Sequence, residues 1–196
     1  PAYDSETALR MALKETIYPV FVSDSGDNPT AGSTADNTEI IGILSTKLQD
    51  ECRNKKILCA GIFDAEVVKI CTENPGKKIT LEVGGKFDNF NCQPVKLSGV
   101  PVKIYHGFGM LKTTLVLFKT DEFELILVSK HIGFTNAEMF KALEIDYLNY
   151  NIIIPKLGYL TEDFKEIAVK SYLALSKGCT DEVLSRLKYS KPYKLI

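Results

Sequence analysis

Residues 17–44 read IYPVFVSDSGDNPTAGSTADNTEIIGIL, and this stretch decides the fold class. Its first six residues are mostly apolar, β-branched or aromatic, which predicts a buried strand over residues 17–22. A polar loop that contains glycine follows over residues 23–36. Asp36 and Glu39 then form a D-x-x-E capping box, which predicts a helix over residues 37–51. A strand, a loop and a helix in this order are the building block of an α/β fold.

The same alternation of strands and helices continues on both sides of this stretch. Asp4 is placed to cap the first helix, and Asp64, Asn136, Thr161 and Thr180 are placed to open later ones. The predicted helices cover residues 5–14, 37–51 and 65–72, with further helices that begin after Asn136, Thr161 and Thr180. The predicted strands of this alternation cover residues 17–22, 56–63, 78–83, 152–154 and 172–175.

The middle of the chain has a different character. Residues 95–104, 113–119 and 123–129 predict three consecutive strands, and a hairpin turn at residues 120–122 joins the last two. We therefore predict one α/β domain over residues 1–196. It is a layered domain with a mixed, largely parallel sheet flanked by helices, and it carries an antiparallel β insert at about residues 95–130.

Length and composition exclude several classes of protein. The chain has 196 residues, of which 45% are hydrophobic, and it carries 24 Lys and Arg against 25 Asp and Glu. This balance provides no field that attracts nucleic acid or an anionic membrane. No apolar run approaches the roughly 18–20 residues that cross a bilayer, and no leader or lipidation motif is visible. We expect a soluble, cytoplasmic chain with no nucleic-acid or membrane partner.

Cysteine and histidine are too few and too scattered for a metal site. The five cysteines are odd in number and contain no C-x-x-C pair, which argues against a zinc ribbon or a redox dithiol. We expect them to be small, reduced core residues. The two histidines, His106 and His131, lack a nucleophile motif nearby and are expected to have structural roles. The prediction is that this chain binds no metal and no cofactor.

The polar loop at residues 23–36 is the first candidate site. Loops between a strand and a helix usually have about 2–6 residues, and this one is much longer. Asp24 and Asp27 offer acceptors or proton shuttles, and Asn28 offers both a donor and an acceptor. Gly32, Ser33 and Thr34 precede a helix, where anions are favoured. The alternative, that Asp and Asn side chains only bond their own backbone, remains open.

Two more loops follow predicted strands. One contains Gly84, Gly85 and Lys86, where two glycines permit a close backbone approach and the lysine can hold an anion. The other contains Lys156, immediately after the strand at 152–154. Because ligands of open α/β sheets bind at the carboxyl ends of strands, we expect all three loops to meet at one edge of the sheet.

The motifs in these loops carry a resemblance to a known family. They are DSGDNPTAG at residues 24–32, GGK at 84–86, KLGYL at 156–160 and LALSKGC at 173–179. In these segments, and in their order and spacing, the chain resembles the C-terminal domain of the microcystinase MlrC-type metallopeptidase family. Two features depart from the family pattern. The histidine-bearing version of the 156 loop is absent, and residues 191–196 match the family's ending only in part.

The resemblance implies that this chain is the second half of a two-domain enzyme. The N-terminal domain of that family holds the catalytic zinc, and the C-terminal domain packs against it. This chain is then expected to be inactive alone and to contribute to the cleft for a small peptide or amide substrate. The start at Pro1 agrees with an excised or processed piece. By this match, Asp24, Asp27 and Asn28 are expected at the cleft, followed by Lys86 and Lys156, and the two aspartates are expected to assist catalysis. Together with the loop residues singled out above, the expected substrate contacts are Asn28, Gly32, Ser33, Thr34, Gly85, Lys86 and Lys156.

Two other functions remain possible from the residues alone. The chain can be a regulatory module that binds a small polar ligand or an anion through the 24–36 loop. It can also be a pure interaction module whose loops pack on another domain without touching a substrate.

Overall fold

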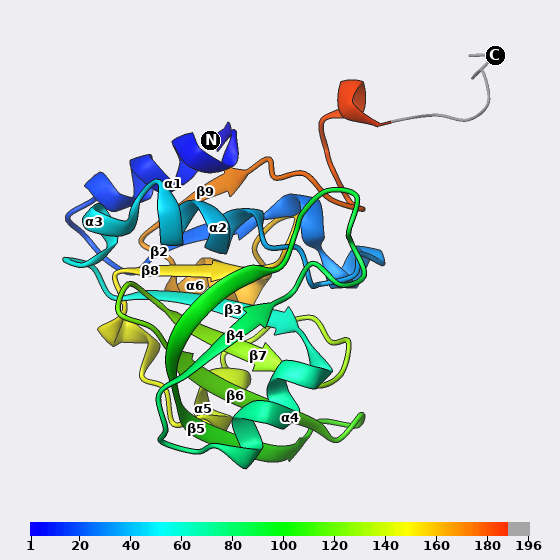
Figure 1. The fold of residues 1–196 in the computed structure, drawn as a ribbon. Helices are drawn as coiled ribbons and strands as arrows, with labels where there is room; N and C mark the ends of the chain where they lie inside the picture. The colour runs from blue at the N-terminus through cyan, green and yellow to red at the C-terminus, as the bar shows by residue number, and fades with distance from the viewer. Residues whose placement is uncertain (188–196) are drawn as a thin grey trace.

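The computed structural model describes residues 1–187, which form one mixed sheet with helices on both faces (Figure 1). The strand order is β1-β9-β2-β8-β3-β7-β6-β5-β4. The first six strands in this order pair in parallel, and the pairs β7–β6, β6–β5 and β5–β4 are antiparallel. The strands are β1 (Ala2–Tyr3), β2 (Val20–Asp24), β3 (Ile57–Phe63), β4 (Ile79–Val83), β5 (Val95–Phe108), β6 (Thr113–Lys119), β7 (Glu124–Val128), β8 (Ile152–Pro155) and β9 (Lys170–Ala174). The predicted fold class is confirmed.

The helices divide between the two faces of the sheet. Residues of α1 (Ser5–Lys14), α2 (Glu39–Thr46), α3 (Gln49–Cys52) and α4 (Ala65–Glu73) belong to one buried cluster. Residues of α5 (Glu138–Ala142) and α6 (Glu162–Ile167) belong to the other. Short 3-10 turns complete the structure: η1 (Ser25–Asp27), η2 (Pro29–Ala31), η3 (Tyr147–Asn149) and η4 (Leu184–Arg186).

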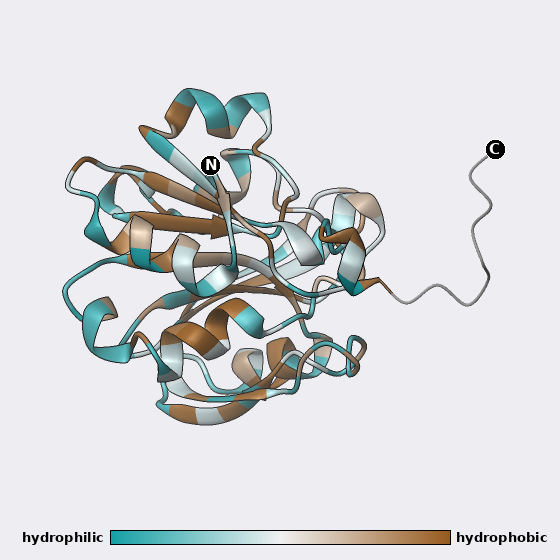
Figure 2. Cartoon of the chain, turned by 90° about the horizontal axis from the view of Figure 1, so that it is seen from above, coloured by the Kyte–Doolittle hydropathy of each residue, from teal (hydrophilic) through white to brown (hydrophobic). Residues whose placement is uncertain are grey.

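The central strands are buried on both faces. In β2, Val20 and Val22 pack in the first cluster, whereas Phe21 packs in the second. This division follows from the alternation of side chains along a strand. Figure 2 shows the same distribution, with hydrophobic strands in the middle of the molecule and hydrophilic stretches on the outer elements. The apolar run in the sequence therefore reflects a strand that is covered by helices on both sides.

The antiparallel region is wider than the predicted insert at residues 95–130. It includes β4, because this strand pairs antiparallel with residues Val95–Gly99 of β5. The second half of β5 pairs instead with β6. The single long strand therefore links β4 to the rest of the sheet. The strand predicted at residues 78–83 exists, but it is not one of the parallel strands.

The helix predicted over residues 37–51 is interrupted. Its first part, α2, begins after Thr38 and ends at Thr46, and α3 begins at Gln49. The Thr46 hydroxyl donates to the Gly42 carbonyl, an interaction that competes with helical hydrogen bonds. Asp36 does not cap the helix as predicted, because its carboxylate accepts hydrogen bonds from the backbone of another loop.

The helix predicted to open at Thr180 is wrong within the described residues. Only the short turn η4 forms there. The Thr180 hydroxyl donates to the Ser25 carbonyl and accepts from the Asn28 backbone N–H, so it serves the β2 loop instead of a helix. The partial family match at residues 191–196 lies outside the described residues. Among the described helices, none combines the length and the apolar composition needed to cross a membrane.

Candidate functional site

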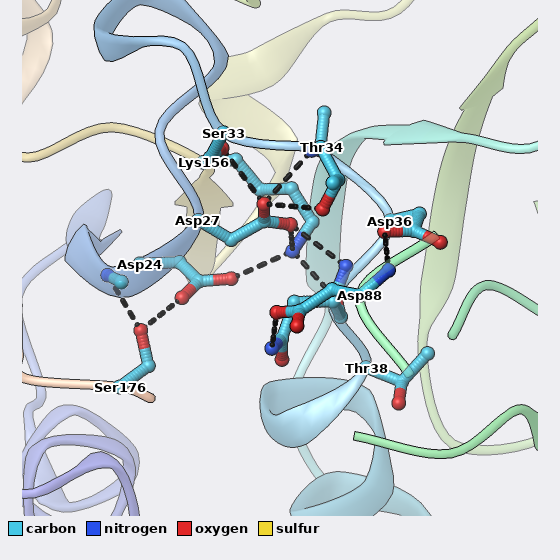
Figure 3. A network of polar contacts seen from close by, with 12 residues as sticks. Asp24, Asp27, Ser33, Thr34, Asp36, Thr38, Asp88, Lys156 and Ser176 are labelled. Carbon is cyan, nitrogen blue, oxygen red and sulfur yellow. Dashed lines mark hydrogen bonds and ion pairs between the residues drawn. The ribbon is translucent and has the colours of Figure 1, made fainter. Parts of the chain in front are cut away.

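The loops after β2 and β8 meet at the carboxyl edge of the sheet around one buried lysine (Figure 3). Lys156 follows β8, and its Nζ lies 2.8 Å from Asp24 Oδ2 and 2.8 Å from Asp27 Oδ2. The same ammonium donates to the Asn37 carbonyl oxygen at 2.7 Å. Direct contacts between side chains of the two loops confirm the prediction that these loops lie together.

Asp27 organises the whole 24–36 loop. Its Oδ1 accepts from the Ser33 hydroxyl and the Ala35 N–H, each at 2.8 Å, and its Oδ2 accepts from the Asn37 N–H at 2.8 Å. Asp24 accepts from the Ser176 hydroxyl as well as from Lys156. Within the described residues, every buried polar side-chain atom has a hydrogen-bond partner. The loop is thus held in one conformation by saturated buried groups.

The shared lysine affects the two carboxyl groups differently. Burial, together with the neighbouring Asp27 charge, raises the pKa of Asp24 above its ordinary value despite the Lys156 ammonium. Burial opposes ionisation of Asp27 as well, but the ammonium and the donors from Ser33 and Asn37 outweigh it and lower the pKa of Asp27. The two carboxylates together outweigh the burial of Lys156 and raise the pKa of that lysine. The lysine is therefore an ammonium ion at neutral pH.

The loop between β4 and β5 joins the same edge through buried carboxylates. The Asp36 carboxylate accepts from the backbone N–H groups of Lys86 at 2.8 Å, Phe87 at 2.6 Å and Asp88 at 3.2 Å. The Asp64 carboxylate accepts from the Gly84 N–H at 2.9 Å. All three loops predicted to converge therefore form one connected edge.

Gly84 and Gly85 make this approach possible. Both have positive φ angles, 63° and 62°. A Cβ at Gly84 would lie 2.4 Å from the Asp36 carbonyl oxygen, and a Cβ at Gly85 would lie 2.6 Å from the backbone of Gln93. The two glycines therefore serve the packing of backbone on backbone.

The predicted contact residues separate into buried and accessible groups. Asp24, Asp27, Ser33, Gly85 and Lys156 are buried, so a ligand does not reach them in this structure. Gly32 is exposed, and Asn28 and Thr34 are partly exposed.

Lys86 stands apart from the other predicted contacts. Its ammonium pairs with Asp64 at 2.8 Å and with Glu66 at 2.9 Å. It therefore has carboxylate partners of its own and does not take part in the Lys156 cluster. The substrate-contact roles of all these residues stay predictions.

These residues do not fit a metal ion. The Lys156 ammonium already occupies the position between the Asp24 and Asp27 carboxylates, where a cation would bind. Within residues 1–187, no group of three or more His, Cys, Asp or Glu side chains is arranged to hold a metal. His131 instead contacts the Ser33 carbonyl through Nε2, and His106 contacts the Thr114 hydroxyl through Nδ1.

Sequence reasoning missed three residues of this cluster. Asn37 bonds Lys156 through its carbonyl and donates its side-chain amide to Asp88 at 2.9 Å, and Ser176 bonds Asp24. Ser176 lies within the LALSKGC motif, which was the available indication of its importance. Asp88 directly follows the predicted loop at residues 84–87, whereas Asn37 carries no comparable sequence pattern, because its partners come from distant loops.

The segment after β9 closes over the 24–28 turn. The Gly26 N–H donates to the Ser176 hydroxyl at 2.8 Å, and the Thr180 N–H donates to the Gly26 carbonyl at 3.0 Å. A Cβ at Gly26 would lie 2.2 Å from the Ser176 carbonyl oxygen. The glycine is therefore required by the close approach of these two backbones.

Comparison with known proteins shows the family of this chain and supports its fold. Residues 22–191 match the family described as MlrC C-terminus. Microcystinase C from Sphingomonas sp is 25% identical over 157 residues, which cover 76% of this chain and 30% of that protein. A crystal structure described as a putative metallopeptidase from Mesorhizobium sp. BNC1 shares the fold, with a TM-score of 0.75 and 14% identity over 91% of this chain and 37% of that one.

The matched part is thus a minor share of each relative, whereas the family match covers most of the present chain. The resemblance predicted from the loop motifs is confirmed. This protein belongs to the MlrC C-terminus family.

Proposed function

We propose that this chain is the C-terminal, non-metal-binding domain of a zinc-dependent peptidase or amide hydrolase. It forms one wall of the active-site cleft and helps to position a small peptide or amide substrate through the loop at residues 24–36. The observation that carries the proposal is the Lys156 ammonium between Asp24 and Asp27, which fixes this loop at the carboxyl edge of the sheet. Family membership supports the same reading.

A wall that positions a substrate has to be rigid, and hydrogen bonds to buried carboxylates hold much of this loop. The Asp27 carboxylate fixes its backbone at Ala35 and Asn37, and the Asn28 side-chain oxygen accepts from the Thr30 N–H at 3.0 Å. Groups that are locked before a ligand arrives lose little freedom on binding. Asn28, Gly32 and Thr34 remain at the accessible rim, so these residues are the ones we assign to substrate contact.

Asp24 and Asp27 act as positioning residues in this proposal. Both are buried, and both carboxylates are engaged by Lys156. Their effect on a substrate passes through the loop that they hold. A direct assisting role in catalysis stays a prediction that requires the loop to open.

The catalytic metal belongs, in this proposal, to a partner domain in the same polypeptide or in a separate chain. The Asp24 and Asp27 carboxylates already pair with Lys156, and the described residues hold no group of three or more His, Cys, Asp or Glu that could bind a metal, so we expect its ligands to come from the partner domain. We expect the chain alone to be inactive and the complete protein to be cytoplasmic. The cavity beside Asp24, Asn37 and Lys156 measures about 10 Å³, which is about the space of one water molecule. A small-ligand pocket inside the loop therefore has no support.

The test uses the protein that contains both domains, loaded with zinc, and a panel of short peptide amides. Asn28→Ala is expected to raise KM by about tenfold with little change in kcat, because it removes a contact made equally in the ground and transition states. Asn149→Ala, in the turn before β8, is the matched control and should change neither constant. The present chain alone, with zinc, should hydrolyse none of the panel. Hydrolysis by the chain alone, or an unchanged KM for Asn28→Ala, contradicts the proposal.

A further inference from the structure

Three aromatic rings, those of Phe63, Phe87 and His131, pack together beside the candidate site, and Phe90 follows Phe87 in the same turn. We call these four residues the aromatic face. Phe87 stacks on Phe63 with ring centroids 5.5 Å apart and planes 16° apart, and His131 meets Phe63 edge-on at 6.0 Å. Phe87 is 62% exposed and Phe90 is 96% exposed. Aromatic side chains are enriched in protein–protein interfaces, and exposed apolar side chains that lie together mark such surfaces.

The segment that carries the two exposed rings is firmly held. The Phe87 N–H donates to the Asp36 carboxylate, and the Asp88 carboxylate on the same segment accepts from Asn37 at 2.9 Å and from Asn91 at 2.7 Å. Phe90 lies between Asp88 and Asn91 in the chain, inside this bonded turn. The backbone that carries the two rings is therefore held by hydrogen bonds to buried carboxylates.

The aromatic face contacts the loop of the candidate site directly. The Phe63 N–H donates to the Ala35 carbonyl at 2.8 Å, and His131 contacts the Ser33 carbonyl. Both acceptors belong to the loop that Asp27 organises. Figure 1 places the 84–94 segment next to the 24–36 loop at the end of the sheet toward which β2, β3 and β8 point. Whatever covers the aromatic face therefore also borders the site.

We propose that the aromatic face docks a folded partner polypeptide, namely the metal-binding domain invoked above, and that the active-site cleft forms between the two surfaces. This inference rests on the proposed function and specifies the surface. The cavity beside Lys156 is about 10 Å³, so a cleft of ligand size over this cluster needs a second wall.

The lengths of the relatives indicate what that second wall is. The chain matches only 30% of Microcystinase C and 37% of the metallopeptidase structure, so both proteins contain a large additional polypeptide. Exposed aromatic side chains are the anchors that such interfaces use most.

The first experiment measures binding of the present chain to the separately produced metal-binding domain by calorimetry. Phe87→Ser and Phe90→Ser should each weaken binding by about tenfold or more. Ile17→Ser and Leu148→Ser are the controls. These residues are 66% and 64% exposed, and they precede β2 and β8 at the opposite edge of the sheet. Equal effects of all four variants would overturn the proposal.

The second experiment does not depend on affinity between separate chains. Hydroxyl-radical footprinting compares the present chain with the protein that contains both domains. Oxidation of Phe87 and Phe90 should fall by about fivefold or more in the longer protein, while oxidation of Leu148 should not change. Unchanged oxidation of both phenylalanines overturns the docking surface.

The two proposals fail in different ways. If the two-domain protein hydrolyses peptide amides while Phe87 and Phe90 are oxidised as strongly as in the present chain, the proposed function stands and the docking surface is wrong. If both rings are protected from oxidation in the two-domain protein but no peptide amide is hydrolysed, the docking surface stands and the proposed function is wrong.

Discussion

Lys156 Nζ lies 2.8 Å from Asp27 Oδ2, in a position where the two side chains are only 5% and 0% exposed. The lysine comes from the end of β8 and the aspartate from the turn after β2, so this one ion pair connects the last third of the chain to its beginning. Asp24 shares the same ammonium. The pair is inaccessible to a substrate but determines the shape of the surface that a substrate would meet.

Removal of the shared ammonium should strongly destabilise the fold. Lys156→Met keeps most of the side-chain volume but leaves two buried carboxylates without their cation. We expect a loss of about 3–5 kcal/mol in the free energy of unfolding, measured by urea denaturation. Lys170→Met removes an ammonium from a surface pair with Glu15, and the resulting loss should be much smaller. Equal losses in the two variants would contradict the structural role of Lys156.

The two carboxyl groups should give opposite pH dependences. The pKa of Asp27 is lowered by folding, so its contribution to stability is present above the unfolded pKa of about 3.9 and is lost as the pH falls through the folded pKa. The pKa of Asp24 is raised by folding, so its contribution is full below about pH 3.9 and is lost as the pH rises through the folded pKa.

Asp27→Asn and Asp24→Asn separate these effects. As the pH falls from 7 toward about 3, the stability advantage of the native protein over Asp27→Asn should shrink. The advantage over Asp24→Asn should grow over the same range. Denaturant titrations at several pH values measure both differences. If the stability difference from the native protein changes with pH in the same direction for both variants, the charges are not distributed as the structure indicates.

Two glycines should respond to alanine in opposite directions. Gly26→Ala places a Cβ 2.2 Å from the Ser176 carbonyl oxygen, and the backbone on both sides has to move. We expect a loss of about 3 kcal/mol or more, comparable to severe overpacking. Gly42 lies within α2, where a Cβ would be 3.6 Å from Val95, an ordinary contact. Gly42→Ala should therefore stabilise the protein by about 0.5–1 kcal/mol in thermal unfolding. A stable Gly26→Ala variant would contradict the close approach of the two backbones.

The cysteines should differ in reactivity according to burial. Cys52, Cys59 and Cys71 are buried, and burial raises the pKa of Cys52 and Cys71 to about 12 each. Cys179 is exposed. In the folded protein, an aromatic disulfide reagent should react first with Cys179, and Cys179→Ser should remove the fast phase. A fast phase that persists in this variant would show that a core cysteine is accessible.

The fold was predictable because its indications are local. The strand at β2 and the capping of α1 by Asp4 follow from residues a few positions apart. α1 has the predicted bounds, whereas β2 covers residues 20–24 instead of 17–22. Errors arose where a side chain has a distant partner. Asp36 matches a helix cap in sequence but binds the backbone of residues 86–88, and Thr180 matches a helix start but binds the turn after β2.

The candidate site follows the same division. Motifs identified the three loops, and topology placed them at one edge of the sheet. That Lys156 is buried between Asp24 and Asp27 depends on packing between β2 and β8, which no spacing in the sequence encodes. Sequence alone predicts a substrate contact for Lys156, which stays a prediction, and the structure adds three internal partners: Asp24, Asp27 and the Asn37 carbonyl.

The strand order also bears on how the chain is made. β2 lies between β8 and β9, which belong to the last quarter of the described residues. While the polypeptide leaves the ribosome, neither edge of β2 has a partner until residues 152–174 have emerged. The sheet is therefore completed only after residues 152–174 are synthesised, and folds dominated by such distant pairings form slowly. A product that stops before β8 would keep an apolar strand with two open edges, which is a risk for aggregation.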